Sequence, residues 1–317
     1  TPKPSSAASD VYKRQTILYE KWNVISFGGI YIMGKEFESN GVNVEIPDEL
    51  ESVVALEYSF VEALAKLELN VTGIADDKDK NNLEHSIKHL VGNYTSVGSR
   101  LEPDAELIKK AEPQLILADK TRHESIFEKL NAAAPTVLLE SFDANYDQSI
   151  ETFKQIAELV SKEDKGRELV VQHNEKVEDL SKDIKLDKDV STIAAVPTHD
   201  GLYVHASHSY VGQFLQKVGF NGSIPEDMEN HLPEYMGADY LKVDTDRFAS
   251  FNPERILIMV DEDNKADYEK LKETEDWLNI EAVRNQRVHD VNRERWAKYR
   301  GLIASELILE DLTNIEE

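Results

Sequence analysis

The sequence predicts an α/β protein made of two similar lobes, each with a mostly parallel sheet, joined by one long rigid helix. Short apolar runs with the length of strands alternate with helical segments in both halves of the chain, as in parallel sheets covered by helices. Segments from the two halves resemble one another, and a charged stretch of helical periodicity separates them. A length of 317 residues also suits two domains.

The connecting helix is expected within residues 161–187. Its apolar residues recur mostly every three or four positions, and most of the other positions are charged or polar. Ser161 is the expected N-cap, and Glu163 places negative charge in the first turn. A helix over residues 161–185 would span roughly 36 Å at about 1.5 Å per residue, which is enough to run from one small lobe to the other.

Two pairs of segments carry the internal similarity. Residues 106–113 and 246–253 each begin with an acidic residue, end with a proline seven positions later and lead into an apolar run. Residues 59–67 and 209–218 each begin with a serine in a polar loop that opens a helix. Because both pairs recur in the same order, a duplicated unit is favoured over the general likeness of any two helix–strand pairs.

The charge balance and the absence of cysteine exclude several classes of protein. The chain has 36 basic and 61 acidic residues, and its net charge of −25 argues against binding nucleic acid, whose phosphates need a basic surface. It has no cysteine, so it forms neither disulfides nor thiolate metal sites. No apolar run approaches the ~20 residues of a membrane-spanning helix.

The N-terminal lobe is expected at residues 21–160. Residues 1–20 are mostly small and polar and lack periodicity, so they are interpreted as a disordered leader or an assembly scar. An edge hairpin closed by Gly41 is expected next. The α/β pattern follows, with strands at 53–56, 71–75, 94–97, 115–118 and 136–139 and helices at 60–67, 104–111, 124–132 and 148–160.

The C-terminal lobe is expected at residues 188–317. It begins with a strand and a turn, after which a second strand returns beside the first. Residues 221–240 and 292–300 are interpreted as loops. The strands are expected at 193–196, 202–205, 255–260 and 288–291, and the helices at 245–251, at 266–280, from 210 and from 301.

Ligands bind beyond the carboxyl ends of the strands in open α/β sheets. The loops expected there are 57–59, 98–103 and 119–123 in the first lobe, and 206–211, 261–265 and 292–300 in the second. They carry positive and aromatic side chains in a chain that is strongly acidic as a whole. The candidate ligand-binding residues on or beside these loops are Arg100, Arg122, Arg300, Arg293, Arg295, Trp296, Tyr210, Tyr58 and His205.

This set predicts a cleft for an anionic ligand, because guanidinium groups form forked hydrogen bonds to carboxylates. The alternative is that the cations are scattered over the surface and paired with the surplus of acids. Arg100, Arg122 and Arg300 fit the cleft better than Arg293 and Arg295, because neighbours two apart on a loop usually face different ways.

The histidines give no recognisable metal site. His199 and His205 flank a turn and could lie side by side, and His208 and His123 are further candidates. A zinc site needs three or four converging ligands, and no compact signature is present, so histidines on a polar rim are the favoured interpretation. No nucleophile elbow or phosphate-binding glycine-rich loop occurs either.

Several segments resemble the substrate-binding proteins of bacterial ABC importers for iron–siderophore complexes. They are residues 53–64, 96–106, 252–258 and 291–301. Residues 118–123 and 208–215 are similar to one subgroup, the iron(III)-dicitrate-binding lipoproteins of Gram-positive bacteria. The resemblance covers residues 40–312 and is more specific for the family than for the ligand.

The resemblance implies a class III periplasmic-binding-protein-like fold and a binding protein without catalysis. Such a protein captures an iron(III)-siderophore, above all iron(III) dicitrate, and delivers it to an ABC permease. Citrate coordinates the iron, so the protein needs no cofactor and no direct metal ligand. The permease-docking carboxylates of the family fall on Glu106 and Asp246, where the second departs from the usual glutamate.

The resemblance also implies a monomeric lipoprotein on the outer face of the cell membrane, although the signal peptide and the lipobox cysteine of the family are not present in this chain. Two alternatives stay in the same class: another ferric siderophore, of hydroxamate or mixed citrate type, or haem. Alternatives from another class are a metal chelatase-like enzyme and a nitrogenase-like subunit. The first lacks a histidine–glutamate chelatase motif here, and the second lacks cluster cysteines.

Overall fold

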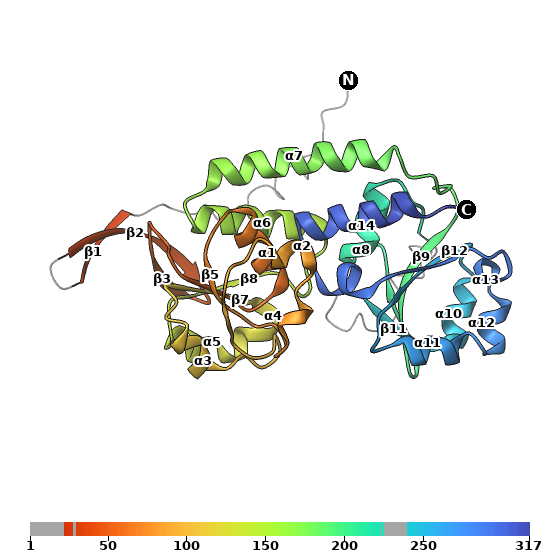
Figure 1. Cartoon of the computed structure of the whole chain (residues 1–317), viewed down its shortest axis with the longest axis horizontal. Coiled ribbons are helices and arrows are strands. Elements are labelled where there is room, and N and C mark those ends of the chain that lie inside the picture. The colour runs from red at the N-terminus through yellow and green to blue at the C-terminus, as the bar shows by residue number, and fades with distance from the viewer. Residues whose placement is uncertain (1–21, 28–29, 223, 225–239) are drawn as a thin grey trace, which may run out of the picture.

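The computed structural model describes residues 22–27, 30–222, 224 and 240–317, with side chains from residue 35 onward. It consists of two lobes, each built on a five-stranded sheet, and the predicted fold class is confirmed. Helix α7 (Glu163–Ser181) runs along one side of the molecule from the first lobe to the second (Figure 1). No helix among these residues is both long enough and apolar enough to span a bilayer.

The sheet of the N-terminal lobe is parallel throughout, with the strand order β6-β5-β4-β7-β8. Its strands are β4 (Val53–Ala55), β5 (Val71–Ile74), β6 (Thr95–Ser96), β7 (Leu115–Asp119) and β8 (Thr136–Leu139). Its helical segments are α1 (Tyr58–Lys66), Lys80–Asn82, α2 (His85–Lys88), α3 (Ala105–Lys110), α4 (Lys120–His123), Glu124–Ile126, α5 (Phe127–Asn131) and α6 (Tyr146–Leu159). All five predicted strands are present.

The sheet of the C-terminal lobe has the order β11-β10-β9-β12-β13 and contains one reversed strand. Its strands are β9 (Thr192–Thr198), β10 (Gly201–His205), β11 (Leu241–Val243), β12 (Arg255–Val260) and β13 (Val288–Asn292). Strand β10 runs antiparallel to both of its neighbours, whereas β9, β12 and β13 are parallel. Strand β11 was not predicted from the sequence.

The helices of the C-terminal lobe follow the prediction except within residues 265–284, where three short helices replace one, and within residues 294–298. They are α8 (Tyr210–Lys217), α10 (Thr245–Phe251), α11 (Lys265–Leu271), α12 (Glu275–Asn279), α13 (Glu281–Arg284), the π-helix Glu294–Lys298 and α14 (Leu302–Asn314). The single helix predicted at 266–280 is wrong, because the Thr274 side chain caps a new helix by accepting a hydrogen bond from the Trp277 N–H. Part of the predicted loop 292–300 is the π-helix.

The two lobes repeat one strand order, with the first strand in the centre, two strands on one side and two on the other, and differ in the direction of β10. Helices α3 and α10 precede the matching strands β7 and β12, and Asp104 and Asp244 cap them in the same way. This agrees with the first matched pair of segments. The second pair is not equivalent, since α1 follows the first strand of its lobe and α8 follows the second.

A three-stranded antiparallel sheet precedes the first lobe, formed by β1 (Trp22–Phe27), β2 (Ile30–Ser39) and β3 (Val42–Pro47). The predicted hairpin closed by Gly41 is confirmed, and positive φ angles of 50° at Asn40 and 73° at Gly41 suit a tight hairpin turn. The Ser39 hydroxyl accepts a hydrogen bond of 2.9 Å from the Leu138 N–H, which attaches this sheet to β8. The leader predicted at residues 1–20 lies outside the described residues.

Helix α7 begins later and ends earlier than predicted. Ser161 is not its N-cap, because Ser161 has a φ of 56° and closes α6 instead. After this left-handed residue, the Lys162 N–H donates to the Ala157 carbonyl over 2.8 Å, as in a helix C-terminal motif. The helix then runs without interruption over 19 residues to Ser181.

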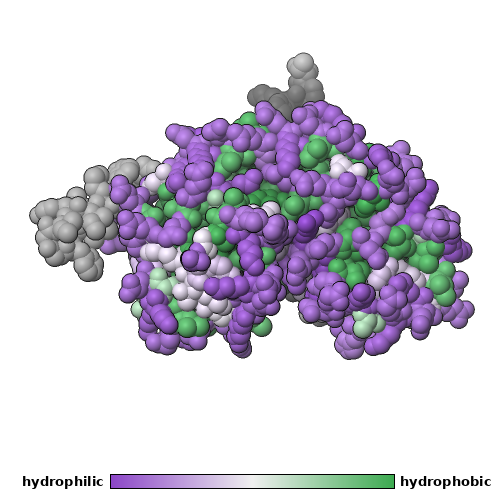
Figure 2. Space-filling view, in the orientation of Figure 1, coloured by the Kyte–Doolittle hydropathy of each residue, from purple (hydrophilic) through white to green (hydrophobic). Residues whose placement is uncertain are grey.

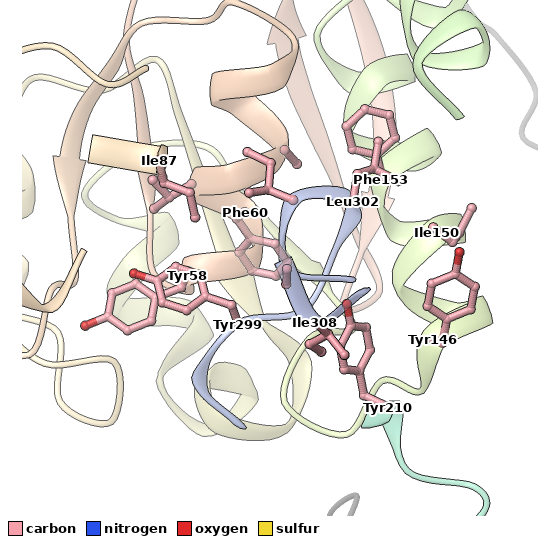
Figure 3. Packing of buried hydrophobic residues seen from close by; sticks show 14 of the residues in the cluster. Tyr58, Phe60, Ile87, Tyr146, Ile150, Phe153, Tyr210, Tyr299, Leu302 and Ile308 are labelled. Atoms are coloured by element: carbon pink, nitrogen blue, oxygen red, sulfur yellow. The ribbon is translucent and has the colours of Figure 1, made fainter. Parts of the chain in front are cut away.

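The largest hydrophobic core extends through both lobes. It contains Val53 from the first sheet, Leu257 from the second, Val177 from α7 and Leu309 from α14, all of them buried. In a close view, Tyr58 of the first lobe lies beside Tyr299, which follows β13 in the second (Figure 3). Hydrophilic side chains cover most of the face seen in Figure 2, as the net charge leads one to expect. The lobes are therefore joined by packing as well as by α7.

A buried carboxyl group sits where α14 meets the N-terminal lobe. Glu62 of α1 accepts hydrogen bonds from the backbone N–H groups of Ile303 and Ala304 in the first turn of α14. Burial raises the pKa of Glu62 to about 7, although these two N–H groups act in the opposite direction. The folded protein therefore binds this proton more tightly than the unfolded chain does.

We expect this proton to shape the pH dependence of stability. The stabilisation from protonated Glu62 is complete below its unfolded pKa, near 4.5, and is lost as the pH rises through about 7. The free energy of unfolding of the parent, minus that of Glu62→Gln, should therefore fall between pH 5 and pH 8 in urea titrations. Glu128→Gln, at an exposed position of α5, should follow the parent, and parallel profiles for Glu62→Gln would contradict the assignment.

Candidate functional site

Two arginines meet one buried carboxylate at the carboxyl edge of the first sheet. The Arg122 Nη1 lies 2.6 Å from Glu57 Oε1, and the Arg100 Nη1 lies 3.9 Å from Glu57 Oε2. Glu57 directly precedes α1 and is 3% exposed. Burial raises the pKa of Glu57 despite the opposing charges of Arg122 and Arg100. A buried carboxylate thus holds the predicted residues Arg100 and Arg122 together.

Arg100 is also bound by Asp77 and stacked on Tyr58. Its Nε and Nη2 donate to Asp77 Oδ2 over 3.0 and 2.8 Å, and its guanidinium carbon lies 4.2 Å from the centre of the Tyr58 ring. Tyr299 stacks on the same tyrosine with ring centres 4.8 Å apart. Burial alone would raise the pKa of Asp77, but hydrogen bonds from Arg100 outweigh it and hold that pKa below its usual value.

His123 fixes the loop that carries Arg100. Its Nδ1 accepts a hydrogen bond of 2.8 Å from the Asp119 N–H, so its Nε2 carries the proton and donates to the Arg100 carbonyl over 2.7 Å. The imidazole is completely buried, and burial lowers its pKa. His123 therefore acts as a neutral structural residue and faces no solvent.

Asp119 organises the neighbouring loop in the same way. Its carboxylate accepts hydrogen bonds from the N–H groups of Arg122, Ser141 and Phe142 at 2.8, 3.0 and 2.8 Å. These contacts bring the start of α4 next to the loop after β8. The Phe142 ring then lies 4.1 Å from the Arg122 guanidinium carbon, a cation–π contact.

Arg300 belongs to a C-terminal segment but lies among residues of the N-terminal lobe. It is 7% exposed and lines a small pocket with Ser59 of α1 and Ser141 of the loop after β8. Because Ser141 also donates to Asp119, this pocket adjoins the loop of Arg122. Arg100 and Arg122 thus share one carboxylate at this sheet edge, and Arg300 lines a pocket that adjoins their loops. These three sequence-predicted residues are here called the arginine cluster.

Arg293 and Arg295 are brought to different partners. Arg293 Nη1 lies 3.0 Å from both carboxylate oxygens of Asp261, which follows β12, and Lys298 lies 3.5 Å from the same group. Arg295 bridges the lobes, with Nη1 3.1 Å from Asp311 of α14 and Nη2 3.4 Å from Glu84 of the first lobe. Each of these predicted cations is therefore paired with carboxylates of the chain.

Trp296 and Tyr210 lie inside the protein. Trp296 is fully buried in the π-helix, and its indole N–H donates to Asp311 over 2.9 Å. The Tyr210 hydroxyl donates to the Gly301 carbonyl and accepts from the Gly301 N–H, both at 3.0 Å. In this structure these two side chains hold the segment around Arg300 in place.

His205 lies at the opposite edge of its sheet from Arg293 and Arg295, which follow β13. Because β10 is antiparallel, its carboxyl end and the loop 206–211 are far from the carboxyl ends of β12 and β13, and the prediction that this loop joins the same edge is wrong. His205 instead lines a separate cavity of ≈ 370 Å³. His199 and His205 are not side by side, because the whole of β10, roughly 17 Å long, separates them. Among the described residues, no three histidine or carboxylate side chains are grouped to hold a metal.

Glu106 and Asp246 occupy equivalent places in the two lobes. Each is the second residue of its helix, after the capping residues Asp104 and Asp244, and each is exposed. Lys109 forms an ion pair of 3.0 Å with Glu106. Helices α3 and α10 both lie on the side of the molecule away from α7 (Figure 1).

Sequence reasoning missed the acidic half of the site. Glu57 and Asp119 each directly follow an apolar run, which is a readable signal, because a charged residue at the end of a buried run needs a partner. Asp77 gave no signal of this kind, since it lies in a loop crowded with other charges.

The comparisons with known proteins agree with this architecture. The chain belongs to the periplasmic binding protein family, whose model matches residues 53–294. Members of this family bind solutes, so the prediction of a binding protein rather than an enzyme is confirmed.

Individual relatives cover most of the chain. The Fe(3+)-citrate-binding protein YfmC of Bacillus subtilis is 34% identical over 263 residues, which are 82% of this chain and 79% of that protein. The Fe(3+) dicitrate-binding periplasmic protein FecB of Escherichia coli is 26% identical over 84% of each chain. The structure of Staphylococcus aureus SirA complexed with staphyloferrin B has the same fold, with a TM-score of 0.74 and 21% identity over 87% of this chain and 96% of that one. The resemblance to iron(III)-dicitrate-binding proteins is thereby confirmed.

The role of His123 can be tested by stability alone. His123→Leu leaves the Asp119 N–H and the Arg100 carbonyl without their buried partner, so the free energy of unfolding at pH 7 should fall by about 3 kcal/mol. Urea denaturation measures this change. His199→Leu, at an exposed turn position, should change stability by at most about 0.5 kcal/mol. Equal stability of the two variants would show that the His123 network is dispensable.

Proposed function

We propose that this protein captures an iron(III)-siderophore outside the cell, namely iron(III) dicitrate, and delivers it to the permease of an ABC importer. The names of the relatives YfmC and FecB, which specify iron(III) citrate, support this ligand. The family supports the class of function, since its members are solute-binding proteins. By analogy with such relatives, the protein acts at the outer face of the membrane as a lipid-anchored monomer.

The arginine cluster is the observation that carries the proposal. Arg100 and Arg122 are stacked on Tyr58 and Phe142 at one edge of the first sheet, in a chain whose net charge is −25. Rigid, stacked guanidiniums suit the recognition of carboxylates by paired hydrogen bonds. Citrate fills the coordination sphere of iron, so the protein contacts the outer carboxylates and supplies no metal ligand. Arg293 and Arg295 would contact the same ligand from the second lobe.

Delivery would use the exposed carboxylates of Glu106 and Asp246. They stand one in each lobe, at the same position of two repeated helices. Carboxylates in this arrangement would fit a pair of basic patches on a permease. Tyr58, Tyr210 and Trp296 would support the site by packing rather than by direct contact, because all three are buried. His205 is also buried, but it lines a separate cavity and has no part in this site.

A titration tests the ligand. Quenching of tryptophan fluorescence should report tight binding of ferric dicitrate and weaker binding of a neutral ferric hydroxamate complex or haem. Arg100→Ala should weaken ferric dicitrate binding at least tenfold, since a charge-assisted hydrogen bond contributes about 1.5–3 kcal/mol. Arg100→Lys should recover only part, because an ammonium cannot form the planar fork.

Arg100 suits this test better than Arg122, whose removal would leave the buried Glu57 without its shorter ion pair. Arg167→Ala, which removes an exposed guanidinium of α7, is the matched control and should bind like the parent. If Arg100→Ala also binds ferric dicitrate like the parent, the site assignment is wrong. If haem or the hydroxamate complex binds more tightly than ferric dicitrate, that compound and not ferric dicitrate is the ligand.

If Glu106 and Asp246 dock to the permease, replacing them should impair uptake and leave ligand binding unchanged. The double variant Glu106→Arg, Asp246→Arg should abolish uptake of labelled iron citrate by cells, because repulsion replaces attraction at the permease, while the purified protein keeps its ligand affinity. The control pair Glu128→Arg, Glu273→Arg reverses two other exposed charges, one per lobe and outside the ligand-facing loops, and should leave uptake intact. Loss of ligand affinity in the purified Glu106, Asp246 variant would show that the pair is structural.

A further inference from the structure

The forked face of Arg100 is occupied by a carboxylate of the chain itself. Asp77 Oδ2 accepts from both Nε and Nη2 of Arg100, and Asp77 Oδ1 accepts from the Arg100 backbone N–H over 2.9 Å. Nε and Nη2 are also the pair of donors that an arginine offers to the two oxygens of a ligand carboxylate. A carboxylate ligand and Asp77 therefore compete for the same donors.

The backbone that presents Asp77 is unusual. Asp77 and Lys78 have φ angles of 58° and 67°, two consecutive non-glycine residues in the left-handed region. Asp76 supports the turn by accepting a hydrogen bond of 3.1 Å from the Lys78 N–H. Left-handed conformations of such residues persist where the surroundings enforce them, and they gather at ligand-binding and switching segments.

The two carboxylates around Arg100 differ in how easily they can leave. The Glu57 side chain is 4% exposed and lies beneath the guanidiniums, where it also binds Arg122 at 2.6 Å. The Asp77 side chain is 31% exposed and lies on a loop. Moving Glu57 would strip a buried charge of its partners, whereas moving Asp77 takes it into water. Asp77 is the carboxylate that can be exchanged.

The charges in direct contact with Arg100 and Arg122 favour such an exchange. Arg100 and Arg122 contribute two positive charges, and Glu57 and Asp77 cancel both. An anionic ligand that approaches this acidic protein therefore meets no surplus of positive charge at the pair. When Asp77 turns away, one positive charge is left for the ligand.

On the basis of the proposed function, we propose that Asp77 holds the place of a ligand carboxylate. In the unliganded protein it keeps Arg100 extended over the Tyr58 ring with its donors satisfied. An arriving carboxylate takes over the Arg100 fork, and Asp77 moves into solvent as an ion. Asp77 thus lowers the affinity for anionic ligands, which must displace it, and does not change the affinity for neutral ligands.

Asp77→Asn tests this exchange. Removing the competing charge should tighten the binding of ferric dicitrate about fivefold to tenfold and leave the binding of a neutral ferric hydroxamate complex unchanged. Glu102→Gln removes one charge from an exposed position of the Arg100 loop and should give less than a twofold gain. In the background of Arg100→Ala the gain from Asp77→Asn should disappear, because no fork remains to compete for.

The possible results separate the two proposals. If the parent binds no ferric dicitrate, the proposed function fails. If the parent binds and Asp77→Asn binds equally or more weakly, the exchange is wrong, and Asp77 is a positioning residue that stays on Arg100 in the complex. An equal gain in ferric dicitrate affinity for Glu102→Gln would also overturn the exchange, because removing any nearby negative charge would then have the same electrostatic effect. Asp77→Ser removes the same carboxylate and is a second variant for this test. The thermal midpoint of each protein shows whether it is folded.

Discussion

One hydrophobic core passes from the first lobe into the second, and the rest of the structure depends on it. Val53 and Leu257 come from different sheets but belong to the same cluster, which Val177 of α7 and Leu309 of α14 complete. Separating the lobes would expose this apolar surface at a cost of about 25 cal/mol per Å². Large hinge motions are therefore disfavoured, and ligand capture must rely on small tilts and on rearrangement of side chains.

Buried carboxylates place the positive charges on this rigid frame. Asp119 accepts three backbone hydrogen bonds, and Glu57 lies beneath Arg100 and Arg122. Buried charges require partners, so each of these acids fixes the geometry of the groups around it. The same acids reduce the positive field that an anionic ligand experiences. The site therefore combines precise placement of its arginines with a low net charge.

Much of the fold could be predicted because it depends on local pattern. The run 115–118 is apolar throughout, as expected for a strand buried on both faces; its even and odd positions enter different clusters, Ile116 on one face and Leu117 on the other. Arg100 and Arg122 were predicted from the rule that ligands bind at the carboxyl ends of parallel strands. The structure places both side chains at that edge.

The failures of prediction have physical causes. The connection from β9 to β10 is too short for a parallel crossover, which needs a dozen or more residues, and 202–205 was correctly predicted to return beside the first strand. The error was to place the loop 206–211, which follows this reversed strand, at the carboxyl edge of the parallel strands. Gly201 in the turn from β9 to β10 has a φ of 141°, and a side chain there would collide with the Val243 carbonyl of a strand that was not predicted. Serine is favoured at helix N-caps, but Ser161 follows the last turn of α6, because α6 must end there to pack on α7. Such outcomes depend on tertiary contacts that local preference does not contain.

The net negative charge of the chain and the arginine cluster act on a ligand over different distances. Charges on the surface act over about one Debye length, ~8 Å at physiological salt, so the −25 is largely screened from a ligand at a distance. At contact, stacked and partly buried guanidiniums lose little to screening, and hydrogen-bond geometry dominates. Discrimination among ligands then rests on whether a ligand carboxylate fits the fork of Arg100 better than the chain's own Asp77 does. A neutral ligand gains nothing from that fork, so an internal carboxylate favours anions while it lowers their absolute affinity.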